Sequence, residues 1–160
     1  MTAYSGNVKS TFVRRPWPIN LPMPDTIHKG KAPYEFVVHA AQLVGYDALA
    51  SPDYRDFTLY VAPQDEVIDA VYLVDDVGLD PDESNYNTLD IRDDTTSTTI
   101  CEVATERGVL AGIPLEITRV CAAANRAVSA GDTVQLRVTG TGNGHAINGE
   151  ALVWVVSHLA

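Results

Sequence analysis

Seven carboxylates gather in the stretch VDDVGLDPDESNYNTLDIRD at residues 74–93, a density that suits a bound cation or an acid–base pair. They are Asp75, Asp76, Asp80, Asp82, Glu83, Asp90 and Asp93. An EF-hand calcium loop needs glycine at its sixth position, glutamate at its twelfth and helices on both sides. Counted from Asp80, those positions hold Asn85 and Ile91, and the flanks have the pattern of strands. We expect a solvated loop between two strands, with a calcium site of another geometry as the alternative.

No other combination of residues matches a known reaction centre. A glycosidase-type pair needs one acid in an apolar pocket, which the acidic stretch does not indicate. The glycine-rich GTGNG at 140–144 lies between two strand-like runs, which indicates a hairpin loop rather than a phosphate site. No G-x-S-x-G elbow is present, and no histidine stands in a zinc-binding spacing; the four are His28, His39, His145 and His158. The sequence predicts no catalytic residue, no metal and no cofactor.

The chain has two cysteines, Cys101 and Cys121, in no C-x-x-C or metal-binding spacing. Free cysteine is among the residue types most often buried, so the favoured interpretation is two small apolar core residues. A disulfide between them stays open, because the sequence does not give the distance between the two Cα atoms.

Charge is unevenly distributed over the 160 residues, which carry a formal net charge of −10. Residues 1–33 hold five basic residues and one acid, a net charge of +4, and no lysine follows Lys31. Residues 34–160 hold six arginines and twenty acids, a net charge of −14. Binding a polyanion requires dense positive charge, so the acidic body argues against nucleic acid as a partner. The basic terminus indicates an interaction arm.

Residues 1–33 contain five of the nine prolines, most of them in RRPWPINLPMPD at 14–25. Proline lacks an N–H and disfavours helix in the preceding residue, so an extended, polyproline-like arm is expected. At roughly 3.1 Å per residue it would reach on the order of 100 Å. A frayed terminus is the alternative, but the apolar side chains favour an arm that orders on a neighbour. The expected contact residues are Arg14, Arg15, Trp17, Ile19, Leu21 and Met23.

The sequence pattern of residues 34–160 predicts a β domain. Short apolar or alternating runs separated by turn signals lie at 57–62, 66–74, 87–93, 97–106, 113–120, 132–140 and 149–157. Residues 34–39 add an eighth strand before an irregular link at 51–56, although residues 36–49 also fit a helix. The pattern predicts an all-β sandwich or barrel. The runs 66–74 and 149–157 are apolar on both faces, which suggests that one face is buried against another subunit.

Alternation within these runs predicts which side chains point inward. Leu89 and Ile91 are expected on the core side of one run, and Val134, Leu136 and Val138 on that of another. The run at 57–62 alternates Phe57, Leu59 and Val61 with Thr58 and Tyr60, and the run at 113–120 places Ile113, Leu115 and Ile117 on one face.

From about residue 57 the chain resembles the jelly-roll cement or decoration proteins of tailed-phage capsids. The strings that carry the resemblance are FTLYVAP, VIDAVYLV, NYNTLDIRD, AGIPLEIT, ANRAVSAGDTVQLRVTGTG and the terminal GEALVWVV. The resemblance implies a jelly-roll-like antiparallel β-sandwich on the capsid exterior that clamps neighbouring coat subunits, often as a dimer or trimer. It supplies no catalytic residues, and it does not extend to the arm or to residues 34–56.

The sequence therefore predicts a non-enzymatic virion protein with an arm at 1–33 and a jelly-roll domain at 34–160. Its expected partners are the major capsid protein and further copies of itself. No apolar run approaches the ~18 residues of a membrane span and no signal-peptide pattern is present, so we expect no membrane contact and assembly in the host cytoplasm. The alternatives are a tail or baseplate β-module, or a carbohydrate-binding module that uses Tyr54, Tyr86 or Trp154. An enzyme is the least favoured reading.

Overall fold

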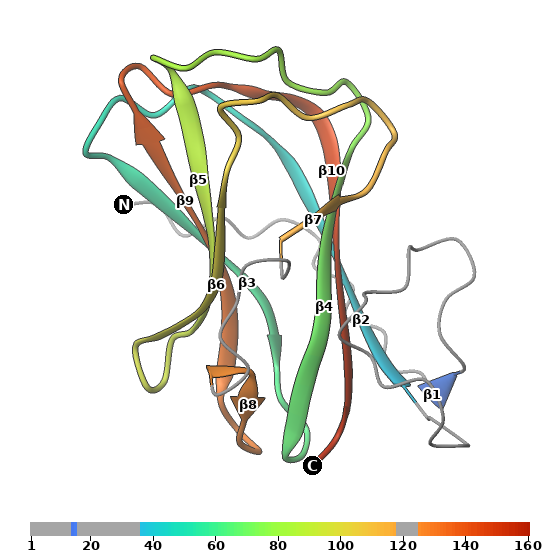
Figure 1. The fold of residues 1–160 in the computed structure, drawn as a ribbon. Helices are drawn as coiled ribbons and strands as arrows, with labels where there is room; N and C mark the ends of the chain where they lie inside the picture. Colours follow the sequence, from blue (N-terminus) through green and yellow to red (C-terminus); the bar gives the residue numbers. More distant parts are fainter. Residues whose placement is uncertain (1–13, 16–35, 118–124) are drawn as a thin grey trace.

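The computed structural model describes residues 14–15, 36–117 and 125–160, which form a sandwich of two antiparallel sheets (Figure 1). The strands are β1 (Arg14–Arg15), β2 (Phe36–Tyr46), β3 (Tyr54–Val61), β4 (Glu66–Asp75), β5 (Tyr86–Asp93), β6 (Thr98–Ala104), β7 (Leu115–Glu116), β8 (Ala127–Val128), β9 (Thr133–Thr141) and β10 (Ile147–Leu159). Within these ranges, no helix has the length and apolarity that crossing a membrane requires.

The strand order is that of a jelly roll. Sheet A has the order β1-β2-β10-β4-β7, with β8 also paired to β4, and sheet B has the order β3-β9-β5-β6. From β2 onward the chain passes from one sheet to the other at most connections, so neighbours in a sheet are mostly distant in sequence. Leaving aside the two-residue strands β1 and β8, each sheet contributes four strands, and two such layers are the hallmark of the jelly roll. The predicted fold class is confirmed for the described residues.

The core lies between the two sheets and follows the period of two that strands impose. Leu89 stands opposite Val138 and Ile91 opposite Leu136 in the β5–β9 ladder, and all four side chains are buried. Burial of an aliphatic side chain of this size stabilises the fold by roughly 1.5–3 kcal/mol. The inward positions predicted for these two strands are confirmed.

The alternation predicted for residues 57–62 is wrong at its end. The β3–β9 register shifts between Thr58 and Tyr60, so the chain contains a β-bulge there. A bulge inserts one residue and exchanges the two faces for the residues that follow. Tyr60 is consequently buried, whereas Val61 is 56% exposed instead of pointing into the core.

Three strand predictions need correction. Residues 36–46 form one long strand, so the helical alternative is wrong, and β3 begins inside the segment expected to be an irregular link. Of the predicted strand at 113–120, the structure describes residues 113–117, and within them only β7 is a strand, because Ile113 closes a turn by donating its N–H to Leu110 O. Ile113 is therefore exposed while Ile117 is buried. The short strand β8 was not predicted.

Strand β4 and the C-terminal half of β10 carry buried apolar side chains on both faces. Ala70, Tyr72 and Val156 join Phe36 in a second apolar cluster, with Trp154 packed against it. Their sequence neighbours belong to the core cluster, so this second cluster lies on the outer face of sheet A. The burial exists within a single chain. Apolar character on both faces of β4 and β10 is thus explained without another subunit, and it no longer argues for an oligomer.

Cys101, on β6, is buried and disulfide-bonded, so its interpretation as a free core residue is wrong. Cys121 lies outside the described residues. The same holds for Trp17, Ile19, Leu21 and Met23 of the predicted arm. Arg14 and Arg15 are placed as β1, where they pair with Val37 and Phe36 at the edge of sheet A.

Candidate functional site

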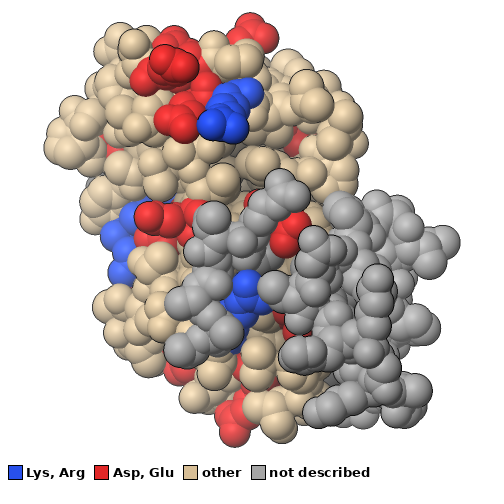
Figure 2. All heavy atoms as spheres, viewed as in Figure 1, with Lys and Arg blue, Asp and Glu red and all other residues tan. Residues whose placement is uncertain are grey.

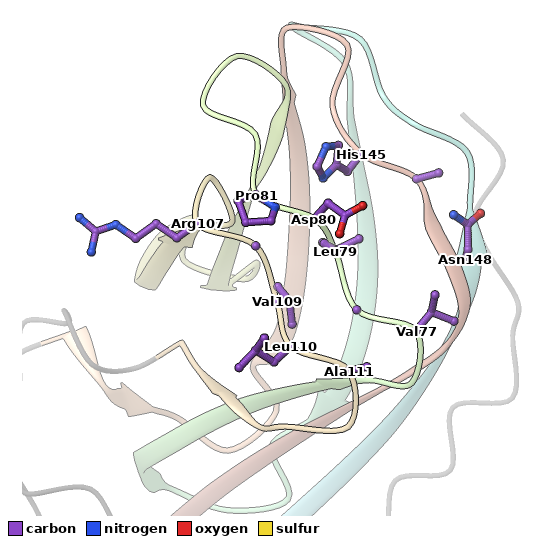
Figure 3. Close-up of a pocket in the computed structure, with 13 residues that line it drawn as sticks. Val77, Leu79, Asp80, Pro81, Arg107, Val109, Leu110, Ala111, His145 and Asn148 are labelled. Carbon is purple, nitrogen blue, oxygen red and sulfur yellow. The ribbon is translucent and has the colours of Figure 1, made fainter.

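A hollow of about 520 Å³ opens at one end of the sandwich, among the loops β4–β5, β6–β7 and β9–β10 (Figure 3). We call it the loop-end groove. Its apolar wall is made by Val77, Leu79, Pro81, Val109 and Leu110, and its polar lining includes Asp80, Arg107, His145 and Asn148. The side chain of Arg107 extends away from the hollow.

Two loops of the groove are joined by a short bridge between Leu79 and Val109. Their backbones exchange two hydrogen bonds, with N···O distances of 2.8 and 2.9 Å. Gly78 and Gly108 precede these residues with φ of 81° and 78°. A Cβ on either glycine would lie 2.7 or 2.6 Å from a carbonyl oxygen of the facing loop. Both positions therefore require glycine, for the positive φ and for the close approach.

Carboxylates in the acidic stretch build the loop rather than face one another. The Oδ1 atom of Asp75, a fully buried residue, accepts the N–H groups of Val77 and Gly78 at 2.9 and 2.8 Å. Asp82 accepts the N–H groups of Ser84 and Asn85 at 2.8 and 2.9 Å. These are turns in which an aspartate side chain caps the following backbone. The backbone hydrogen bonds from Asn85 and Ser84 lower the pKa of Asp82.

Removal or addition of calcium should leave the protein unchanged. Among the described residues, no three acidic, histidine or cysteine side chains are grouped as metal ligands. A cation bound only by the folded state would raise its stability with concentration. We therefore expect the melting temperature to move by less than about 1 °C in millimolar calcium or EDTA, measured by differential scanning fluorimetry. A saturable rise with calcium would restore the metal-site alternative.

Asn87, which sequence reasoning missed as a site residue, holds the third loop of the groove. Its Nδ2 donates to His145 O at 2.9 Å, and its Oδ1 accepts from His145 N at 3.0 Å. Its backbone N–H donates to Thr105 Oγ1, and the Thr105 hydroxyl in turn lies 3.1 Å from Asn87 O. Asn87 is fully buried at the start of β5. One side chain thus links β5 to the β9–β10 loop, while its backbone links β5 to the end of β6.

A buried polar cluster lies at the other end of the sandwich, where β4 begins and β10 ends. Ser157 donates to Glu66 Oε2 at 2.7 Å, and His39 Nε2 lies 3.3 Å from the same oxygen. The His39 ring stacks on Tyr60 with centroids 3.6 Å apart. In a hydrolase triad the imidazole lies between serine and acid. Here the carboxylate lies between them, and all four residues are buried, so the cluster has the arrangement of a structural network.

Glu66 is held in its charged form. Burial alone would raise its pKa, but the hydrogen bonds from His39 and Ser157, together with the nearby Tyr60 hydroxyl, outweigh burial and lower the pKa below its ordinary value. Burial, together with the Glu66 charge, raises the pKa of the Tyr60 hydroxyl. Neither group is tuned toward proton transfer at neutral pH.

The three aromatic residues of the glycan-binding alternative do not form one platform. Tyr54 and Tyr86 belong to sheet B, whereas Trp154 packs on the outer cluster of sheet A. One face of the Tyr54 ring is covered by Arg137, whose Cζ lies 4.2 Å from the ring centroid. Arg137 is held there by a bidentate pair of hydrogen bonds, in which its Nε and Nη2 atoms donate to the two carboxylate oxygens of Asp56 at 2.7 and 2.8 Å.

Comparisons with known proteins identify no family for the chain. No protein-family model and no curated protein matches the chain. Among solved structures, the chain is similar to one titled "Structure of infectious bursal disease virus Gx strain", at 10% sequence identity and a TM-score of 0.29. The match covers 92% of this chain but only 42% of that one, and a likeness this low carries no argument.

Proposed function

We propose that the chain is a viral structural protein, and more specifically a cement or decoration protein that binds the outer surface of a capsid. The observation that carries the proposal is the joining of a basic arm to an acidic jelly roll. Arg14 and Arg15 add a short strand to the edge of sheet A through Val37 and Phe36. Since one fold hosts many functions, the jelly roll alone would not support this role.

The proposed mechanism depends on wide contact rather than on a deep pocket. The arm would lay Arg14, Arg15, Trp17, Ile19, Leu21 and Met23 on the major capsid protein. Its anchorage at β1 would fix where it leaves the sandwich. Several weak contacts that share one scaffold reinforce each other, which suits a protein that clamps neighbouring coat subunits. The acidic sandwich would stay outside, on the capsid exterior, where its charge opposes self-aggregation. A dimer or trimer would multiply these contacts.

Deletion of residues 1–33 should abolish capsid binding and leave a folded β-domain. The arm supplies the positive charge and apolar contacts, whereas the described core lies in residues 36–160. The measurement is co-sedimentation with capsids that lack the chain, together with circular dichroism of the truncated protein.

A double substitution tests the proposed contact residues while the rest of the arm stays in place. Arg14→Glu combined with Trp17→Ala should also lower the bound fraction to background, whereas Asn20→Ala in the same arm should bind like the unmodified chain. Undiminished binding by the truncated protein would refute the role of the arm.

A further inference from the structure

The outer face of sheet B carries polar side chains in rows that cross its strands. Leu89, Ile91 and Leu136 point into the core, so the residues next to them in sequence point outward. The strand registers align these outward side chains from β3 through β9 and β5 to β6. The first row is Tyr54, Thr139, Thr88 and Ala104, the second is Asp56, Arg137, Asp90 and Glu102, and the third is Thr58, Gln135, Arg92 and Thr99. We call these residues the polar face.

The charges of the polar face are paired with one another. Arg137 donates to both carboxylate oxygens of Asp56, and Arg92 Nη1 lies 3.8 Å from Asp90 Oδ2. The three acids and two arginines of the face sum to −1, whereas residues 34–160 carry −14. Figure 2 shows basic as well as acidic side chains on the left of the molecule, where Figure 1 places sheet B. The polar face therefore presents no strong field of one sign to a charged partner.

The polar face contains no aliphatic side chain larger than alanine. The core of a protein–protein interface is apolar and depleted of charged residues, which is the opposite composition. Hydroxyl groups take the place of apolar groups here. They belong to Thr58, Thr88, Thr99 and Thr139. Alternating donors and acceptors on a nearly uncharged face suit an uncharged ligand that is itself rich in hydroxyl groups.

Tyr54 adds an aromatic surface to the polar face. The Cζ atom of Arg137 lies 4.2 Å from the ring centroid and covers one side of the ring. Tyr54 is nevertheless 44% exposed, so the other side of the ring is open. The hydrogen bonds from Arg137 to Asp56 fix the guanidinium, and the guanidinium in turn supports the ring. An open ring of this kind packs against the C–H face of a sugar, while polar neighbours bind the sugar hydroxyls.

Three polar atoms of the polar face have no hydrogen-bond partner within the described ranges. They are Asp90 Oδ1, Arg92 Nε and Gln135 Oε1, and their residues are neighbours in the second and third rows. A buried polar atom without a partner is unfavourable. A hydroxyl group both donates and accepts hydrogen bonds, so a ligand with several hydroxyls can partner the two oxygens as well as the N–H.

A second aromatic residue lies at the end of the polar face. Tyr86 stands opposite Thr141, two residues along β9 from Thr139, which is the partner of Tyr54. With β9 between them, the Cα atoms of the two tyrosines are about 12 Å apart, a span that a short oligosaccharide covers. We infer that the polar face of sheet B binds a neutral oligosaccharide. This inference goes beyond the proposed capsid role and does not depend on it.

The test is binding of the full chain to an array of neutral oligosaccharides of glucose, mannose, galactose and N-acetylglucosamine. The best probe is then titrated in solution up to millimolar concentration by isothermal titration calorimetry. The unmodified chain should bind at least one probe saturably. Tyr54→Ala should weaken that binding by about tenfold or more, whereas Tyr54→Phe keeps the ring and should stay within about threefold. Because the ligand is uncharged, added salt should leave the affinity unchanged.

Two further variants complete the test. Arg137→Ala removes the support of the Tyr54 ring and should also weaken binding, although Arg137 acts here as a positioning residue. Leu152→Ala is the matched control, because Leu152 is an exposed residue of sheet A, and it should bind like the unmodified chain. Circular dichroism and the melting temperature confirm that each variant is folded.

Several outcomes would overturn the inference. They are the absence of saturable binding to every probe, undiminished binding by Tyr54→Ala, an equal loss in Leu152→Ala, or a steep loss of affinity with salt. Self-association of the unmodified chain that Tyr54→Ala abolishes, measured by sedimentation velocity, would make the polar face a contact between copies and would also overturn it.

Discussion

Replacement of Glu66 by alanine is expected to destabilise the protein by about 3–5 kcal/mol, the cost of removing one partner from a buried charged network. Glu66 is fully buried at the first position of β4, and its Oε2 is the shared partner of Ser157 and His39. For a domain of this size the change corresponds to a fall in melting temperature of roughly 6–20 °C. Urea unfolding followed by tryptophan fluorescence measures the free energy directly.

The expected loss is large because the remaining groups cannot be rehydrated. Without the carboxylate, the Ser157 hydroxyl loses its acceptor in a site that is sealed from water. A buried polar group without a partner costs more than the bond itself contributes. Glu66→Gln keeps the size and one acceptor oxygen, so it should lose less than Glu66→Ala.

The pH dependence of the loss follows from the lowered pKa of Glu66. Because the folded state binds this proton less readily than the unfolded state, the contribution is complete above the ordinary pKa of 4.5. This stabilising contribution of Glu66 declines as the pH falls through the pKa that Glu66 has in the folded state, which lies below 4.5. Burial raises the pKa values of Asp69 and Asp90, so these two carboxyls favour folding at low pH rather than at high pH. Both are present in the unmodified chain and in Glu66→Gln, so their effect cancels in the difference between the two. The stability difference between the unmodified chain and Glu66→Gln should therefore shrink below pH 4.5.

Glu102→Ala is the matched control, because Glu102 is an exposed glutamate on β6. An exposed strand residue of this kind should change stability by less than about 0.5 kcal/mol. If Glu66→Ala and Glu102→Ala unfold at the same urea concentration, the network around Glu66 does not stabilise the fold.

The fold was predictable where alternation alone determines the structure. Strands β5 and β9 are amphipathic, so their pattern in the sequence predicts their inward residues and places their limits within one residue. The prediction failed where a local backbone event changes the pattern, as at the bulge after Thr58 and the turn before Pro114. Such events depend on the partner strand, which a single run of sequence does not contain.

The site was less predictable than the fold, since it is assembled from loops that are distant in sequence. The carboxylates of the acidic stretch suggested a cation site or an acid–base pair, yet Asp75 and Asp82 cap turns by accepting backbone N–H groups. The apolar residues Val77 and Leu110 form the exposed part of the groove, and their separation in sequence conceals it. The glycines before Leu79 and Val109 are the signal that could have indicated two loops in close contact.

Replacement of Asn87 by alanine is the second change with a large expected effect, a destabilisation of about 2–4 kcal/mol. Its side-chain amide donates to the C=O of His145 at 2.9 Å and accepts from the N–H of His145 at 3.0 Å. The backbone of a residue in a neighbouring strand would make the same pair of hydrogen bonds. Alanine leaves the N–H and C=O of His145 without these partners. Since His145 lines the groove, the β9–β10 loop should also exchange its amide protons faster in this variant.

Asn87→Asp distinguishes the hydrogen bonds from the size of the side chain. Aspartate has the same shape, and its Oδ1 would still accept from His145 N, but its second oxygen would face His145 O, which is also an acceptor. It also brings a charge into a fully buried position, so we expect it to be at least as destabilising as alanine. Asn143→Ala, in the exposed part of the same loop, should change stability by less than about 0.5 kcal/mol. If Asn87→Asp proves as stable as the unmodified chain, the amide is not what holds this loop, and the groove must owe its shape to the bridge between Leu79 and Val109 instead.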